Sequence, residues 1–130
     1  MALDIRHPDL ETLDKMEAGM RTGIEKVAGD IGLTINLDRI FSYEPIHFDE
    51  GCVSTVRAAA ELCGFSKRDI VSGAGHDSCY ISRVAPTSMI FVPCIDGISH
   101  NEIEDAKPEW ISAGGNVLFH AILEKAGHLS

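Results

Sequence analysis

Residues 88–92 read Ser-Met-Ile-Phe-Val, with four consecutive apolar side chains and no polar residue alternating among them. A strand that is apolar at every position is typical of a sheet that is covered on both faces. Such a strand needs neighbours within its sheet, and the sequence predicts one other strand in this half of the chain, at residues 69–72. The chain is therefore expected to form part of a larger layered structure.

The first 48 residues predict a strand at residues 2–6, a helix and a second strand. Pro8 suits the first position of a helix, where its missing N–H is no loss. Apolar residues then recur at steps of three and four, which is typical of an amphipathic helix over residues 8–30. Residues 33–38 alternate between apolar and polar, as in a half-buried strand. This unit buries little surface by itself and is also expected to belong to a larger layer.

Pro45 and the residues after it interrupt the pattern, and we place the domain boundary here, between residues 1–48 and 49–130. A helix is expected after residue 49, with Gly64 as its C-cap. A last helix is expected to open at Pro108, with an inner stripe of Ile111, Gly114, Leu118, Ala121 and Ile122. Strands that alternate with helices predict an α/β (α+β) fold class.

Charge and composition exclude several kinds of protein. The net charge of −9 would repel phosphate backbones and anionic lipid, which argues against a nucleic-acid or membrane-surface partner. The longest apolar runs are far shorter than the roughly 20 residues of a membrane helix. The first residues do not read as a signal peptide, so a cytoplasmic location is expected. The four cysteines form no CxxC pair and lie among apolar residues, as buried free thiols do.

Two polar loops follow predicted strands, at residues 73–77 and 97–104. In an open α/β sheet, functional sites lie beyond the carboxyl ends of the strands, and glycine lets a backbone approach a ligand closely. His76 and His100 are candidate metal ligands, because carboxylates near each of them could orient an imidazole. A loop histidine is more often a surface group, and an arginine such as Arg6 more often forms a surface ion pair. Both readings stay open at this point.

Four motifs follow one another along the chain: LDIRHPD from Leu3, SGAGHD from Ser72, PTSMIFVP from Pro86, and GISHN from Gly97 followed by Glu104. This ordered set resembles the C-terminal part of the hydantoinase/carbamoylase amidases. These include the N-carbamoyl-L-amino acid hydrolases, the allantoate amidohydrolases and the β-ureidopropionases. The resemblance extends from Leu3 to about Gly127 and identifies a family without identifying a substrate.

The resemblance implies a role for each matching position. His100 would be a metal ligand and Arg6 would hold the substrate carboxylate, a task for which the planar guanidinium is suited. Gly75 and His76 would contact the substrate, whereas Asp77, Asn101 and Glu104 would organise the site from behind. The intact enzyme would hold a dinuclear site of Zn (or Mn, Co or Ni). Its other ligands and its catalytic glutamate would lie upstream of this chain, so the chain itself is not expected to bind metal tightly.

The resemblance also implies an architecture and an activity. Residues 1–48 would be the second half of a ferredoxin-like lid and dimerisation domain, and residues 49–130 the C-terminal part of a zinc-aminopeptidase-like catalytic domain. The intact enzyme would hydrolyse the C–N bond of N-carbamoyl (ureido) amino acids or related linear amides that carry a carboxylate. It would form a homodimer or a higher oligomer, and this truncated chain would be inactive alone. Two alternatives remain: a free-standing non-catalytic module that completes its sheets between chains, and a peptidase or aminoacylase of the same clan.

Overall fold

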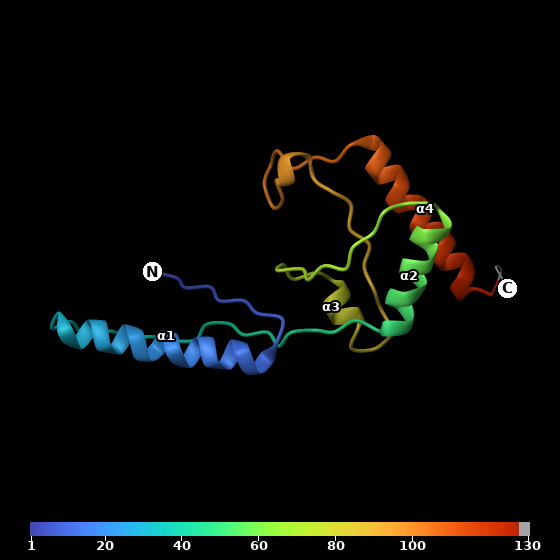
Figure 1. The fold of residues 1–130 in the computed structure, drawn as a ribbon. Coiled ribbons are helices and arrows are strands. Elements are labelled where there is room, and N and C mark those ends of the chain that lie inside the picture. The colour runs from blue at the N-terminus through green and yellow to red at the C-terminus, as the bar shows by residue number, and fades with distance from the viewer. Residues whose placement is uncertain (128–130) are drawn as a thin grey trace. The chain divides into compact units, whose positions relative to one another are not determined.

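The computed structural model describes residues 1–127 (Figure 1). Its helices, in chain order, are α1 (Leu10–Asp30), α2 (Glu50–Leu62), α3 (Ser78–Ile81), the short 3-10 turn η1 (Ile95–Gly97) and α4 (Pro108–Lys125). The chain divides into two compact units. The first unit contains Met1–His47 and Val71–Ala74, and the second contains Phe48–Ile70 and the chain from Gly75 onward.

Helix α1 confirms the amphipathic helix predicted for residues 8–30. Asp9 is its N-cap, and its carboxylate accepts a hydrogen bond of 2.8 Å from the backbone N–H of Thr12. This bond satisfies one of the free N–H groups at the start of the helix. The helix ends before Gly32, which adopts the left-handed φ of +70° that is common after a C-cap.

The segment after α1 is attached to the helix by charged side chains. Glu17 forms ion pairs with Arg21 on the helix and with Arg39 beyond it. Arg21 also donates a hydrogen bond of 3.1 Å to the carbonyl of Leu37. The pKa of Glu17 is lowered by these contacts, first by the hydrogen bond from Arg21 and then by Arg39. The segment predicted as a strand therefore lies along α1.

Helices α2 and α4 pack against each other to form the core of the second unit (Figure 1). Ala59 and Ala60 of α2 meet Val117 and Ala121 of α4, and these four side chains are buried. Small side chains let the two backbones approach closely. Both helices were predicted, but the inner stripe of α4 was wrong in part. Ile111, Leu118 and Ile122 are more than half exposed, whereas Ala121 is buried.

Asp49 sets the start of α2, as Asp9 does for α1. Its carboxylate accepts a hydrogen bond of 2.8 Å from the backbone N–H of Cys52. The pKa of Asp49 is lowered, chiefly by this bond. Helix α4 begins with Pro108 in its first turn, as the sequence predicted, because this position needs no N–H.

The predicted strands are the main correction to the sequence analysis. Residues 2–6, 33–38, 69–72 and 88–92 are non-helical, but no strand is assigned to them and no backbone ladder joins any two of them within residues 1–127. The α/β class is therefore not shown, and the regular structure that is described is helical. The physical reason is that a strand is stabilised by hydrogen bonds to a neighbouring strand, whereas side-chain alternation predicts only the preference of a single segment.

Residues 88–92 pack one face against the pair of long helices. Ile90 contacts the core between α2 and α4. Val92 lies so close to α4 that a Cβ on Gly114 would come within 2.7 Å of Val92 Cγ1. Phe91, between them, is 44% exposed. The sequence predicted a segment covered on both faces, whereas the face that carries Phe91 is only partly covered, by the ring of His76.

A large apolar surface is uncovered. Several large apolar side chains are more than two thirds exposed, among them Ile40, Phe41, Val71 and Val84. Within residues 1–127 the buried apolar side chains are Ala28, Ala59, Ala60, Val117 and Ala121, so no large side chain is fully buried. The core is therefore much smaller than a composition of 45% hydrophobic residues would allow.

Helices long and apolar enough to span a membrane are absent from residues 1–127.

Substitutions at the neighbouring positions Gly114 and Gly115 test the contact with Val92. A Cβ at Gly115 would meet no atom within 4 Å, so Gly115→Ala is expected to raise the free energy of unfolding by about 1 kcal/mol through helix propensity. Gly114→Ala should lower it by about 1–3 kcal/mol, because the new methyl group overpacks against Val92. Chemical denaturation followed by circular dichroism measures both. Equal effects of the two substitutions would contradict the close packing.

Candidate functional site

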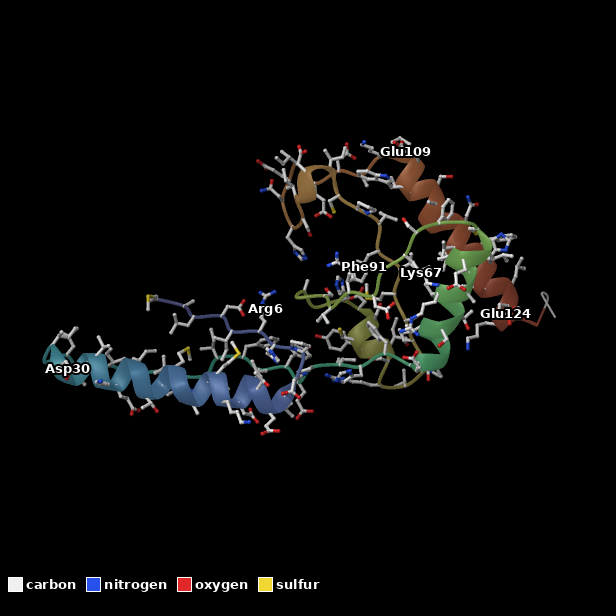
Figure 2. The ribbon with its side chains drawn as sticks, in the orientation of Figure 1. Arg6, Asp30, Lys67, Phe91, Glu109 and Glu124 are labelled. Carbon is white, nitrogen blue, oxygen red and sulfur yellow. The ribbon has the colours of Figure 1, made fainter. Side chains whose placement is uncertain are left out.

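Arg6 lies where two of the four motifs meet, inside the first unit. Its Nε atom lies 3.1 Å from both carboxylate oxygens of Asp4, and Nη2 completes the ion pair. Its Nη1 atom donates a hydrogen bond to the carbonyl oxygen of Gly73. The guanidinium thus joins the segment that contains Asp4 to the glycine loop (Figure 2).

The pair of Asp4 and Arg6 is open to solvent, with side chains 65% and 63% exposed. The hydrogen bond from Arg6 lowers the pKa of Asp4, and the same bond raises the pKa of Arg6. Exposed ion pairs are weak, because water and salt screen them. The guanidinium is therefore accessible to a second carboxylate, and Asp4 already occupies part of its fork.

The boundary between the two units falls within the glycine loop of residues 73–77, since Ala74 belongs to the first unit and Gly75 to the second. In the first unit, the Ser72 hydroxyl accepts a hydrogen bond of 3.2 Å from the N–H of Ala74. In the second unit, the half-buried His76 ring meets the edge of Phe91, with 5.6 Å between ring centroids. The carbonyl of Asp77 accepts hydrogen bonds from the N–H groups of Tyr80 and Ile81 at the end of α3, and its carboxylate caps nothing there.

Gly75 is not required to be glycine by the packing of the described residues. A Cβ at this position would meet no atom within 4 Å, and the φ of Gly75 is not positive. The backbone of Gly75 is thus open on the side where a side chain would stand.

His100 has an unusual backbone conformation. Its φ is +55°, in the left-handed region that non-glycine residues rarely adopt. This conformation costs about 1–2 kcal/mol for a residue with a Cβ. The N–H of His100 donates a hydrogen bond of 2.7 Å to Oε2 of Glu104. Such strained residues are concentrated at functional sites, because the surrounding structure must hold them in place.

The rest of this loop is held by its own backbone and by Asn101. The Oδ1 atom of Asn101 accepts from the N–H of Ile103 at 3.2 Å, and its carbonyl accepts from the N–H of Glu104 at 2.9 Å. The base of the loop is closed by the N–H of Ile95, which donates to the carbonyl of Asp105 at 2.7 Å. Asn101 and Glu104 therefore act on the backbone around His100 rather than on its ring.

The residues present do not make a complete metal site. Nowhere in residues 1–127 do three or more His, Cys, Asp or Glu side chains gather so that they could hold an ion. A catalytic zinc site needs about three protein ligands and an open position. His100 alone cannot provide this set. All four cysteines are free and half-buried.

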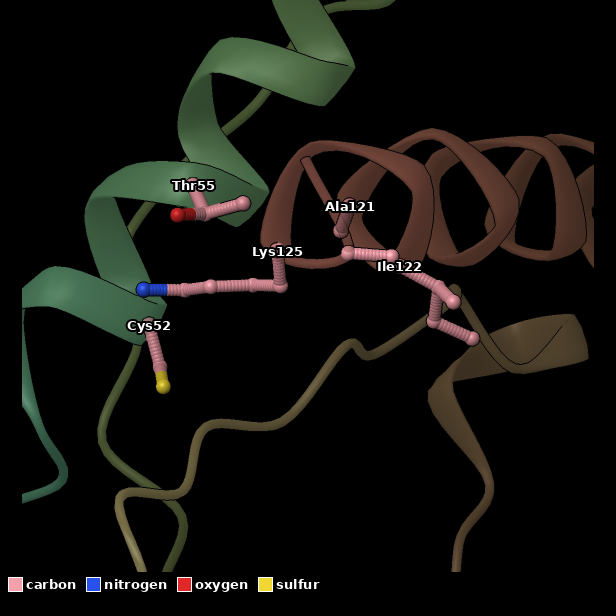
Figure 3. A pocket seen from close by; sticks show the side chains of 6 residues that line it. Cys52, Thr55, Ala121, Ile122 and Lys125 are labelled. Atoms are coloured by element: carbon pink, nitrogen blue, oxygen red, sulfur yellow. The ribbon is translucent and has the colours of Figure 1, made fainter. Parts of the chain in front are cut away.

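A pocket in the second unit is separate from the predicted site. It has a volume of about 410 Å³ and lies between the start of α2 and the end of α4 (Figure 3). It is lined by Cys52, Thr55, Ala121, Ile122, Lys125 and Ala126. Burial raises the pKa of the Cys52 thiol, against a smaller opposing effect of Lys125. None of the predicted site residues lines this pocket.

Sequence reasoning missed two residues that contact the predicted site. Asp4 pairs with Arg6, and its position two residues earlier in a non-helical segment was a usable signal, because such residues share a face of an extended chain. Cys94 contacts Glu104 at 3.7 Å across ten residues, and no spacing rule would have indicated it.

Comparison with known proteins decides the family. The model of peptidase family M20/M25/M40 matches residues 3–124, which is nearly the whole chain. The chain belongs to this peptidase family.

The relatives of this chain have more specific descriptions. The chain is 47% identical over 124 residues to the N-carbamoyl-L-amino-acid amidohydrolase of Rhizobium meliloti. This match covers 95% of this chain and 30% of the relative. It is 32% identical over 117 residues to the allantoate amidohydrolase of Bacillus subtilis, covering 90% of this chain and 28% of the relative. The chain therefore spans about 30% of the length of these curated relatives.

A solved structure from the same family superposes closely. An amidase of the hydantoinase/carbamoylase family from Burkholderia multivorans is 61% identical, with a TM-score of 0.90. The match covers 93% of this chain and 29% of that chain. The resemblance to this family that the four motifs indicated is thus confirmed. It extends over nearly all of this M20 chain and over only part of each relative.

The strain at His100 predicts an unusual order of stability between two substitutions. Glycine adopts a φ of +55° without steric cost, so His100→Gly is expected to be about 1 kcal/mol more stable than His100→Ala. Thermal and chemical denaturation of the purified variants measure this difference. At Ser99, whose φ is not positive, the matched pair should show the opposite order, because glycine loses more entropy on folding. The same order at both positions would contradict a left-handed His100.

The lowered pKa of Asp4 predicts the effect of removing its partner. With Arg6→Gln, the pKa of Asp4 should rise toward its ordinary range, as measured by carbon NMR titration of the carboxyl group. Asp9 is the control, because its lowered pKa is caused by Thr12 and should not change. Since the pKa of Asp4 is lowered on folding, the pair stabilises the fold above the ordinary pKa and is lost as the pH falls through the lowered one. An unchanged titration of Asp4 would contradict the pairing.

Proposed function

We propose that this chain is the C-terminal portion of a metal-dependent amidohydrolase of the carbamoylase type, and that it is inactive alone. The intact enzyme would hydrolyse the C–N bond of N-carbamoyl (ureido) amino acids or related linear amides. The observation that carries the proposal is the close superposition on a hydantoinase/carbamoylase family amidase over nearly all of this chain and less than a third of the other. The printed names of the curated relatives point to the same class of hydrolase.

The uncovered surface supports the incompleteness of the chain. Residues 69–72 and 88–92 have the sequence of strands but no ladder partner within residues 1–127. Ile70 and Val71 are more than half exposed, as are Leu118 and Ile122 of α4. We propose that residues 1–48 are the second half of a ferredoxin-like lid and dimerisation domain, and that residues 49–130 are the C-terminal part of the catalytic domain. The missing strands of an α/β sheet would come from the rest of the enzyme.

Arg6 is proposed to anchor the carboxylate of the substrate. Its guanidinium is exposed, and its contact with the Gly73 carbonyl fixes one edge while Asp4 pairs with the other. A substrate carboxylate would replace Asp4 on the fork, exchanging one charge-assisted pair for another. Gly75 and His76 would add backbone and ring contacts to the same substrate.

His100 is proposed to be one metal ligand of the intact enzyme, with Asp77, Asn101 and Glu104 as supporting residues. The left-handed backbone of His100 and its bond to Glu104 fit a residue whose direction must be fixed. Zn, or Mn, Co or Ni, would be held there only together with ligands from outside this chain. The homodimer and the cytoplasmic location expected from the sequence remain parts of this proposal.

A chimera with the Rhizobium meliloti relative tests the proposal. Residues 3–126 of this chain would replace the corresponding segment of that amidohydrolase, and hydrolysis of N-carbamoyl-L-amino acids would be measured on the folded chimera. We expect activity from the chimera and none from this chain alone. Turnover by the purified 130-residue chain, or a folded chimera without activity, would contradict the proposal.

Substitutions in the chimera separate the two proposed roles. Arg6→Gln should raise KM for the carboxylate substrate by about 10–100-fold, the loss expected for one or more hydrogen bonds to a charged group. His100→Ala should instead lower kcat and the bound metal content. Arg68→Gln is the matched control, because Arg68 is an exposed arginine outside all four motifs. An equal KM for the Arg6 and Arg68 variants would remove Arg6 from the substrate site.

A further inference from the structure

One carboxylate in the second unit has both of its oxygens engaged. Oε2 of Glu104 accepts a hydrogen bond of 2.7 Å from the backbone N–H of His100. Its Oε1 atom lies 3.7 Å from Sγ of Cys94, within hydrogen-bond range for sulfur. The thiol of Cys94 and the backbone of His100 are thus joined through a single side chain.

We propose that Cys94 is a positioning residue which, through Glu104, holds the backbone of His100 in its left-handed conformation. A glutamate on an exposed loop can rotate about three side-chain bonds, and Glu104 is exposed. A second contact on the other oxygen restricts this rotation and keeps Oε2 directed at the N–H of His100. The thiol therefore stabilises a conformation that it does not itself touch.

The chemistry of the thiol suits this role. Burial raises the pKa of Cys94, with the nearby carboxylate of Glu104 as a smaller cause, so the thiol keeps its proton at neutral pH. A protonated thiol is a weak donor, and the carboxylate is an acceptor without a proton to give. The donor is therefore Cys94 and the acceptor Glu104. Serine replaces the thiol with a stronger hydroxyl donor on a slightly shorter bond, which supplies a conservative substitution.

Among the hydrogen bonds of this loop, the bond to Glu104 is the one that His100 itself makes. The bond between Ile95 and Asp105 closes the base of the loop, and Asn101 holds Ile103 and Glu104. Each of these bonds fixes the loop around His100, and none of them is made to His100 itself. The effect of Cys94 on the backbone of His100 does not depend on the proposed function. Its value for metal binding by His100 rests on that function.

The test measures the exchange of the His100 amide proton by NMR on the nitrogen-15-labelled chain. Cys94→Ala should raise this exchange rate by about two- to fivefold, the factor expected for the loss of a weak hydrogen bond. Glu104→Ala should raise it further, because the acceptor itself is lost. Cys94→Ser should restore a rate close to that of the unchanged chain. Cys63→Ala is the matched control, because it removes a half-buried thiol at the end of α2.

The outcomes separate positioning from general destabilisation. Amides of α4 such as Val117 report the stability of the second unit, and their exchange should be the same in the Cys94 and Glu104 variants as in the unchanged chain. A Cys94→Ala rate equal to that of the unchanged chain, or no restoration by Cys94→Ser, would overturn the proposal. So would a similar rise in Cys63→Ala. An inactive chimera would count against the proposed function and leave this amide result unaffected, so the two failures are distinguishable.

Discussion

The close contact between α2 and α4 is the interaction on which the second unit depends. Ala59 and Ala60 on one helix meet Val117 and Ala121 on the other, and small side chains allow the backbones to come together. Residues 88–92 then rest on this pair through Ile90 and Val92, and the absence of a side chain on Gly114 makes room for them. The loop that carries His100 begins just after this segment, so its starting point is set by helix packing.

The first unit is organised by charge rather than by a core. Glu17 links α1 to the segment after it, and Arg6 links its own segment to the glycine loop. Both contacts are made by long side chains on a largely exposed surface, where water competes with them. This unit therefore has fewer buried contacts than the second, which agrees with its proposed place in a larger layer.

The helices could be predicted from the sequence and the strands could not, for a physical reason. The hydrogen bonds of α1, α2 and α4 lie within each segment, so apolar periodicity and a capping aspartate or a proline were enough. The segment at residues 88–92 has a strand-like sequence, but its hydrogen-bond partners lie outside the segment. The motifs identified the family correctly. The left-handed backbone of His100 could not be predicted, because a histidine in a sequence does not indicate a positive φ as a glycine often does.

Association between copies of this chain depends on two features described above. One is the exposed apolar face of α4, with Ile111, Leu118 and Ile122, and the other is the net charge of −9. The apolar face favours contact between molecules, and the like charge keeps them apart. Salt shortens the range of the repulsion to about 10 Å at 0.1 M and leaves the apolar attraction in place. The colloidal behaviour of the isolated chain is thus governed by ionic strength, and low salt favours separate molecules.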